Sequence, residues 1–138
     1  RKHKNSEIIL PQRSTKFSAG YDFFSPVDFT IPGKDFVKVF TDVKAYMMED
    51  EVLKIYIRSS LATKNSITLV NNVGIIDCDY YNNVDNDGII IIPLYNHDYR
   101  PITFESGTKI AQGIFEKYLK TDFDNIENIR NGGFGSTS

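Results

Sequence analysis

The chain lacks several features that would place it in a specialised class of protein. It has one cysteine, Cys78, among 138 residues, which excludes an intrachain disulfide and fits a reducing compartment. No apolar run is long enough to span a membrane, and no signal peptide is apparent. The formal net charge is only −2, so no overall basic field attracts nucleic acid. We therefore expect a soluble, cytoplasmic protein that binds neither membranes nor nucleic acid.

Helical periodicity is also scarce. No window of helical length carries an apolar stripe at i, i+3, i+4 and i+7, and only residues 61–66 suggest one short helix. Short apolar segments separated by Gly, Pro, Asn and Asp recur instead. One of them, at residues 52–57, places Leu53, Ile55 and Ile57 on one face of a strand. The pattern predicts an all-β barrel or sandwich.

The chain shows no internal repeat and no linker, and its length suits one domain with a substantial hydrophobic core. We expect an all-β core over residues 1–119, with a frayed polar start at residues 1–7 and a short strand at 8–10. Residues 120–138 are rich in Asp, Asn, Gly and Ser and have little to bury. They are predicted to form a mobile C-terminal arm.

The stretch of residues 70–93 contains the strongest candidate for chemistry. Two isoleucine-rich runs, 75–76 and 89–92, flank a polar segment of Asn, Asp and Gly, which predicts a β-hairpin. Asp77 and Asp79 end the first run two residues apart, so they point to the same side of the sheet. They either form a turn through backbone hydrogen bonds or include a partly desolvated general base. The segment alone leaves both interpretations open.

The segment RSSLA, residues 58–62, follows the strand predicted at 52–57. Arg58, Ser59 and Ser60 combine a guanidinium group, two hydroxyl groups and backbone N–H groups, all of which suit phosphate oxygens. The alternative is a helix N-cap at one of the serines, with a solvated arginine beside it.

The segment GTKIAQ, residues 107–112, begins another predicted strand. Gln112 is expected to face the same way as Ile110 and Ile114, on what looks like a core face. A buried amide needs hydrogen-bond partners, which are either structural or supplied by a phosphate and a water molecule.

The C-terminal segment RNGGFGSTS, residues 130–138, combines three glycines with hydroxyl groups. The glycines allow the backbone to lie close to a ligand, and Ser136 and Thr137 offer hydroxyls suited to phosphate. A flexible Gly/Ser tail is the alternative. Phe134 favours a binding role, because an aromatic ring can stack on a nucleic-acid base.

Taken together and in order, AGYDFFS, RSSLA, GIIDCDY, GTKIAQ and RNGGFGSTS resemble the five motifs of the trimeric dUTP diphosphatase (dUTPase) family. They span residues 19–137. The resemblance implies a jelly-roll-like distorted barrel (β-clip) subunit and a homotrimer with active sites shared between subunits. It also implies Mg²⁺-dependent hydrolysis of dUTP to dUMP and pyrophosphate. That reaction keeps uracil out of DNA and supplies dUMP for thymidylate synthesis.

The resemblance assigns the central residues a role in recognition and catalysis. Asp77 would be the general base that activates the water attacking the α-phosphorus. Tyr80 would pack beneath the deoxyribose and leave no room for a 2′-hydroxyl. The backbone of residues 71–76 and 89–91, with the substrate-binding residues Asn71, Gly74 and Ile76, would read uracil. Cytosine would be rejected because buried polar groups would remain unpaired.

The remaining motifs would hold the triphosphate. The residues expected to contact phosphate are Arg58, Ser59, Ser60, Gln112, Arg130, Ser136 and Thr137. Phe134 would stack on uracil as the arm, including Gly135, closes over the nucleotide. Asp22 would contact Mg²⁺ only through water, since Mg²⁺ keeps most of its hydration shell.

Two other functions fit parts of the sequence. A dCTP deaminase shares the fold and a similar RSSLA segment, but its catalysis resembles a Glu-based deamination, and the matching segment here, IIIIPLYN, has no Glu. A trimeric regulatory or binding protein could also retain the fold.

Overall fold

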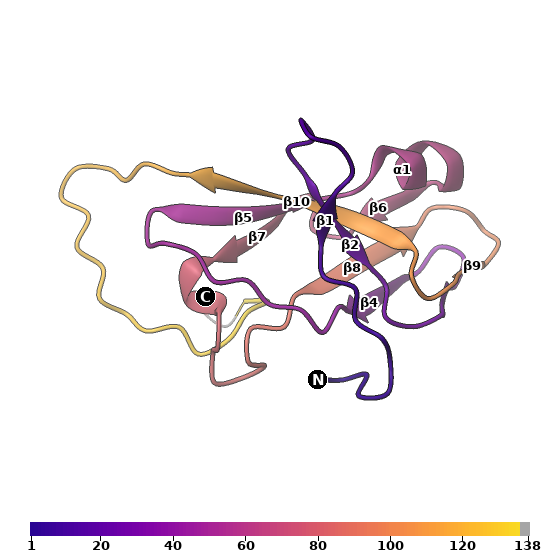
Figure 1. Ribbon diagram of the computed structural model, residues 1–138, viewed down its shortest axis with the longest axis horizontal. Coiled ribbons are helices and arrows are strands. Elements are labelled where there is room, and N and C mark those ends of the chain that lie inside the picture. Colours follow the sequence, from indigo (N-terminus) through magenta and orange to yellow (C-terminus); the bar gives the residue numbers. More distant parts are fainter. Residues whose placement is uncertain (136–138) are drawn as a thin grey trace.

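Antiparallel strands make up most of the regular structure in this computed structural model, which describes residues 1–135 (Figure 1). The strands are β1 (Gln12–Arg13), β2 (Tyr21–Phe24), β3 (Phe29–Ile31), β4 (Phe36–Phe40), β5 (Glu51–Tyr56), β6 (Ile67–Leu69), β7 (Gly74–Asp77), β8 (Ile91–Asn96), β9 (Ile102–Phe104) and β10 (Lys109–Lys117). The helical elements are α1 (Ser59–Asn65) and the 3₁₀ helix η1 (Cys78–Tyr80). The all-β prediction is confirmed, as is the short helix. At 7 residues, α1 is too short to cross a membrane, and no other helix within residues 1–135 is long enough.

The strands form three sheets. The largest has the order β1-β2-β10-β5-β7, the second β4-β8-β6, and the third pairs β3 with β9. Figure 1 shows β5 and β10 side by side across the molecule, with β8 and β4 in a separate layer. One hydrophobic core lies among these sheets and includes Ile31, Leu53, Ile92 and Leu94, each no more than 2% exposed. The predicted jelly-roll-like architecture is therefore built from two main sheets around a common core.

Strand β5 shows why the period-two pattern was informative. Leu53 and Ile55 are each 2% exposed, whereas Lys54 and Tyr56 between and beyond them are partly exposed. The strand lies between β10 and β7, so both of its edges are hydrogen-bonded. Because β5 is central, its two ends fix the positions of the polar groups described below.

The predicted β-hairpin in residues 70–93 is wrong. β7 pairs with β5 in the large sheet, whereas β8 pairs with β4 and β6 in the second sheet. The polar segment is held by its own hydrogen bonds and carries the chain from one sheet to the other. The two isoleucine-rich runs therefore meet as parts of different sheets, and a pocket opens between them.

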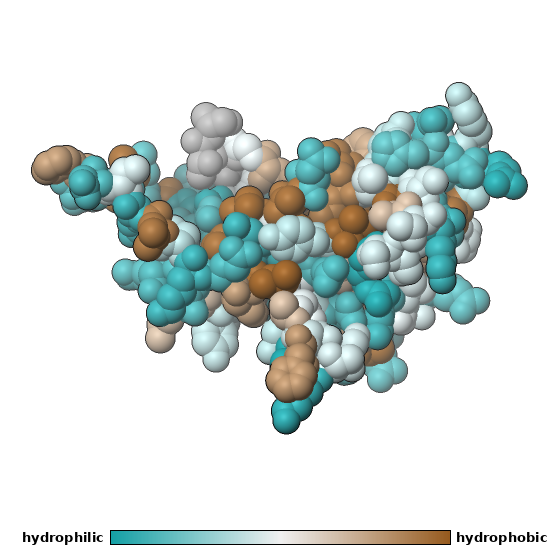
Figure 2. All heavy atoms as spheres, turned by 90° about the horizontal axis from the view of Figure 1, so that it is seen from above, coloured by the Kyte–Doolittle hydropathy of each residue, from teal (hydrophilic) through white to brown (hydrophobic). Residues whose placement is uncertain are grey.

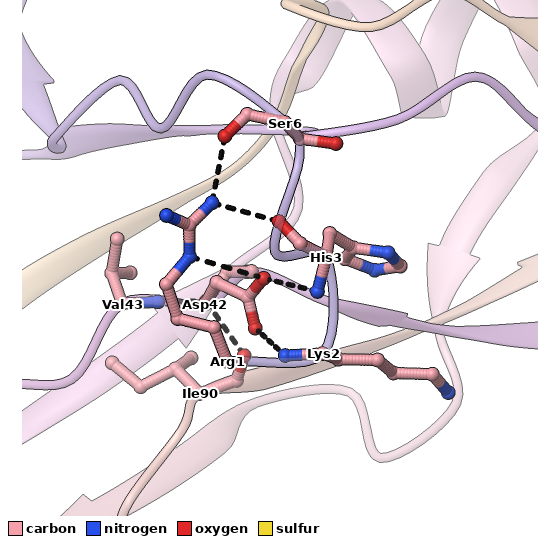
Figure 3. Close-up of polar contacts among 8 residues, drawn as sticks. Arg1, Lys2, His3, Ser6, Asp42, Val43 and Ile90 are labelled. Atoms are coloured by element: carbon pink, nitrogen blue, oxygen red, sulfur yellow. Dashed lines mark hydrogen bonds and ion pairs between the residues drawn. The ribbon is translucent and has the colours of Figure 1, made fainter.

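The start of the chain also differs from the expectation. Residues 8–10 form no strand, and pairing begins at β1, after Pro11, which has no N–H to donate to a ladder. Residues 1–7 were expected to fray, but their backbone is anchored (Figure 3). The buried Asp42 carboxylate accepts hydrogen bonds of 2.7 Å from the backbone N–H groups of both Lys2 and His3.

The segment after β10 leaves the core as an exposed loop. Residues 121–129 are all exposed, and Figure 1 shows them swinging away from the sheets before the chain returns. Figure 2 shows hydrophobic surface gathered near the middle of the face seen from above, with a largely hydrophilic end on the right and a mixed end on the left. The returning residues, 130–134, lie beside the segment that joins η1 to β8.

Candidate active site

A pocket of about 260 Å³ opens between β7 and β8, where the two sheets meet. Its apolar wall includes Ile55, Ile75, Ile76 and Ile91, and we call it the isoleucine pocket. The predicted site residues on its lining are Asn71, Gly74, Ile76, Asp77, Tyr80, Arg130 and Phe134. The structure thus brings the central motif and the C-terminal motif together in one place.

Two glycines let the backbone form the pocket walls. At Gly74 a Cβ atom would lie 3.0 Å from Cβ of Ile55 and 3.7 Å from Nδ2 of Asn71. At Gly133 a Cβ atom would lie 2.8 Å from Cε1 of Tyr80. The arm backbone therefore packs directly against the Tyr80 ring, which a side chain at position 133 would prevent.

Tyr80 is the rigid part of the pocket. Its side chain is 5% exposed, its hydroxyl donates a 2.8 Å hydrogen bond to the carbonyl of Ile89, and Nδ2 of Asn86 donates to it at 2.8 Å. Burial raises the pKa of the Tyr80 hydroxyl, so the ring stays neutral and keeps donating. The pocket thus has a fixed aromatic surface beside Asp77.

Asp77 ends β7 at the rim of the pocket, and its side chain is 48% exposed. Its Oδ2 accepts a 2.6 Å hydrogen bond from Nη2 of Arg130, while Oδ1 of Asp79 accepts one of 2.6 Å from Nε. The two carboxylates therefore reach the same guanidinium group, although Asp79 lies in η1 and not on a strand as predicted. Asp77 is the N-cap residue of η1, but its side chain makes no capping hydrogen bond. Among the described residues, the Asp77 carboxylate therefore does not act as a turn former.

A second polar group lies at the other end of the large sheet, and we call it the Asp22 cluster (Ser14, Asp22, Arg58 and Lys109). The buried Asp22 carboxylate meets Nε of Arg58 at 3.1 Å and Nζ of Lys109 at 3.4 Å. The hydroxyl of Ser14 donates to it at 2.7 Å. The sequence alone does not point to Ser14 or Lys109 as site residues, because nothing in it shows that residues so far apart meet.

Arg58 sits at the junction of β5 and α1. Arg58 is the N-cap residue of α1 and has an extended backbone conformation. No side chain among the described residues makes a capping hydrogen bond to this helix. The alternative in which Ser59 or Ser60 serves as the N-cap is therefore not realised. Both serines lie in the first turn of α1, next to the guanidinium group of Arg58 in sequence.

Gln112 faces the same way as Ile114, as predicted, but this is not the core face and Ile110 does not share it. A register shift between Lys109 and Ala111 makes both Ile110 and Ala111 fully buried, which reverses the alternation from that point. Gly113 then faces the core, where its Cβ would meet Phe23, and Gln112 points to the opposite side. Gln112 packs against Gly20 and pairs with Asp22 across the ladder, so it belongs beside the Asp22 cluster.

Asp77 and the Asp22 cluster are separated along β5. Asp77 lies opposite Val52, whereas Gln112 lies opposite Tyr56, ~13 Å further along the strand. Arg58 lies beyond Tyr56, at that same far end. Within one chain, the structure therefore does not bring Arg58 and Gln112 to Asp77.

The described residues do not form a protein-only metal centre. Residues 1–135 contain no group of three or more His, Cys, Asp or Glu side chains placed to hold an ion. Both oxygens of Asp22 are already engaged with cations or a hydroxyl, which leaves room for a contact through water but not for direct ligation. Gly135 is described and has φ 92°, whereas Ser136 and Thr137 lie outside the described residues.

Comparisons with known proteins agree on one family. A family model described as dUTPase matches residues 6–138. A deoxyuridine 5′-triphosphate nucleotidohydrolase of Lactococcus lactis is 41% identical over 138 residues, covering 99% of this chain and 92% of the relative. The one from Arabidopsis thaliana is 34% identical over 141 residues, covering 99% and 80%.

Solved structures share the fold. The crystal structure of dUTPase from Streptococcus mutans superposes with a TM-score of 0.79 at 38% identity, covering 84% of this chain and 97% of that one. A mutant dUTPase from phage phi11 of S. aureus, whose structure describes the coordination of a structural Mg(II) ion, gives 0.72 at 20% identity, covering 88% and 91%.

Proposed function

The chain belongs to the dUTPase family and hydrolyses dUTP to dUMP and pyrophosphate; we propose that Asp77 is the general base of this reaction. The observation that carries the proposal is the position of Asp77 at the rim of a pocket walled by isoleucines and closed on one side by Tyr80. Oδ2 of Asp77 is held by Arg130, while the side chain remains accessible to water. A positioned carboxylate of this kind can take a proton from water as the water attacks the α-phosphorus.

The isoleucine pocket is the site that we assign to the base and sugar. The edge backbone around Asn71, Gly74 and Ile76 supplies N–H and C=O groups for uracil. Cytosine reverses the hydrogen-bonding polarity at its 4-position, so it would leave buried groups unpaired. The Tyr80 ring lies where it can pack beneath the deoxyribose, and the isoleucine wall resists the additional methyl group of thymine.

The Asp22 cluster is the site that we assign to phosphate. Arg58 and Lys109 contribute two cations against the single carboxylate of Asp22, so the cluster keeps positive charge for an anion. Because it lies at the far end of β5, we assign the cluster used with each Asp77 to a neighbouring copy of the chain. A closed homotrimer satisfies this requirement for every copy.

Magnesium is proposed as a cofactor that the triphosphate itself holds, with Asp22 contacting it only through water. When bound, Mg²⁺ would neutralise charge on the phosphate oxygens. The residues of this chain would orient the substrate: Ser59, Ser60 and Gln112 beside the phosphates, and Phe134 over the base. A cytoplasmic location is part of the proposal, and it fits the single unpaired Cys78.

Arm closure completes the proposal. Phe134 lines the isoleucine pocket, where its ring can stack on uracil. Arg130 lies beside Asp77, near the proposed point of attack. Closing the arm over the nucleotide would exclude bulk water and strengthen these contacts with charged groups.

The test is a pyrophosphate-release assay on dUTP, dCTP, dTTP and UTP, with and without Mg²⁺. We expect release from dUTP with Mg²⁺ and little from the other three nucleotides. Ammonia release from dCTP would support the deaminase alternative, although β8 carries no Glu. Binding of dUTP without turnover would instead support a regulatory trimer and contradict the catalytic role of Asp77.

A further inference from the structure

The tip of the arm makes a specific set of contacts with the rest of the chain. Arg130 is only 17% exposed, and it divides its guanidinium group between Asp77 and Asp79 while also donating to the carbonyl of Gly132 at 2.9 Å. The residues before it, 121–129, are all exposed. The arm therefore changes from an exposed segment to a docked one at Arg130.

The segment between η1 and β8, residues 81–88, receives the arm. The backbone N–H of Asp85 donates a 3.1 Å hydrogen bond to the carbonyl of Asn131. A Cβ atom at Gly132 would lie 2.9 Å from Cβ of Asp85, so the Gly132 backbone packs directly against the Asp85 side chain. We call residues 81–88 the docking loop.

The docking loop is fixed by a network of two amide side chains, the buried Asn83 and the partly exposed Asn86. Asn83 is 7% exposed, and its Oδ1 accepts from the N–H groups of Asp85 and Asn86 at 3.0 Å each. Its Nδ2 donates to the carbonyl of Tyr80 and to Oδ1 of Asn86, both at 2.7 Å. Asn86 in turn donates to the Tyr80 hydroxyl. One network thus positions both the pocket aromatic and the N–H group that holds the arm.

We propose that Asp79 and the docking loop form the docking site of the arm, with Asp79 as a positioning residue that acts through Arg130. Asp79 is not part of the pocket lining. From outside the pocket, its carboxylate holds the Arg130 guanidinium group in the orientation that also contacts Asp77. This inference deepens the proposed function and rests on it. The same contacts can form whichever copy of the chain supplies the arm.

The first test measures docking without any turnover. Trypsin cleaves after both Lys120, on the exposed part of the arm, and Arg130, which is docked, so cleavage after Lys120 is an internal standard. In Asp79→Asn, we expect cleavage after Arg130 to rise roughly fivefold relative to Lys120, because proteolysis follows the population of the released state. Asp98→Asn is the matched control, since Asp98 is also paired with an arginine, Arg100, but lies outside the docking loop. An unchanged ratio in Asp79→Asn would overturn the proposal.

The second test separates positioning from a purely structural effect. Asp79→Asn should lower kcat/KM for dUTP about fivefold, the order expected for one partly exposed charge-assisted hydrogen bond. In an Arg130→Gln background the same change should have no further effect, because Asp79 acts only through that side chain. Equal losses in both backgrounds would contradict the proposal.

The third test uses the close approach of the Gly132 backbone to the Asp85 side chain. Gly132→Ala should raise cleavage after Arg130 and lower kcat/KM, because its Cβ would collide with Asp85. Asp85→Gly in the same chain removes the obstructing atom and should restore both readouts; failure to restore either would count against docking at this loop. If the parent protein releases no pyrophosphate while both cleavage results hold, the proposed function fails and the docking site stands.

Discussion

The isoleucine pocket, between the two main sheets, and the Asp22 cluster, on the large sheet, differ in how complete each is within a single chain. The pocket has its walls, its aromatic surface and its candidate base in place, with the arm lying across it. The Asp22 cluster offers three charges, which are balanced mainly against each other. Within a single chain, the isoleucine pocket already has the shape of a binding site, whereas the Asp22 cluster contributes charged groups.

The difference follows from the chemistry of the two halves of a nucleotide. A flat base needs a fitted slot whose buried donors and acceptors stay aligned, which requires local packing. A triphosphate needs cationic side chains that can move. Such side chains stay paired with a carboxylate until a more highly charged anion binds them. Arg58 and Lys109 are 29% and 40% exposed around the 8% exposed Asp22 side chain, so they can reach outward while Asp22 stays buried. We infer that substrate joins the two regions across a subunit boundary.

The largest expected effect comes from breaking the pocket half alone. Asp77→Asn keeps the shape and removes the basic oxygen, so kcat for dUTP should fall about 10³-fold, within the usual contribution of a general base. Binding of a non-hydrolysable dUTP analogue, measured by calorimetry, should change far less. Asp98→Asn is a suitable control, because Asp98 is a partly exposed partner of Arg100 and belongs to neither region. A variant with full turnover would refute the assignment.

The second prediction tests whether the two halves come from different copies. Arg58→Gln should lower kcat/KM about 10²-fold by removing a charged phosphate contact. When differently tagged Asp77→Asn and Arg58→Gln chains are co-expressed, mixed trimers isolated through both tags should regain about one third of the parent activity, because one site per trimer has both groups intact. Mixed trimers as inactive as either variant would show that both groups act within one chain.

These two regions also differ in how far they could be predicted from the sequence. The β5 pattern and the placement of Asp77 beside an apolar run are local, and both appear in the structure. The hairpin was wrong because pairing of β7 with β5 and β8 with β4 is a long-range choice that short turn signals do not determine.

The Asp22 cluster was harder to predict because its members are far apart in the chain. Ser14, Asp22, Arg58 and Lys109 meet only after β2, β5 and β10 have aligned. The orientation of Gln112 depends on a bulge, and a shift of one residue reverses every side chain that follows. Most of these residues lie in the segments that resemble the family motifs. Only the fold shows that the motif residues divide between the Asp22 cluster and the isoleucine pocket.

The third prediction sharpens the pocket side of the comparison. Phe134→Ala should weaken dUTP binding by about 1 to 3 kcal/mol, the usual value of one base–aromatic stack. The expected readout is a higher KM, with dUMP binding weakened by a similar amount because both ligands carry uracil. Phe123→Ala is a matched control, since Phe123 is 99% exposed on the arm before the docked tip. Unchanged KM and turnover in Phe134→Ala would argue against stacking.

The smallest expected effect tests how rigidly the pocket is preformed. Tyr80→Phe removes the hydrogen bonds with Ile89 and Asn86 and should cost about 1 kcal/mol of unfolding free energy. Burial raises the folded pKa of Tyr80, so above pH ~10 the unfolded chain loses this proton while the folded chain keeps it. The contribution is therefore fully present below pH ~10 and is lost as the pH rises through the higher folded pKa. The urea midpoints of the parent protein and of Tyr80→Phe should converge as the pH rises above 8 into the alkaline range. Parallel plots of midpoint against pH would mean that Tyr80 ionises as freely in the folded pocket as in the unfolded chain.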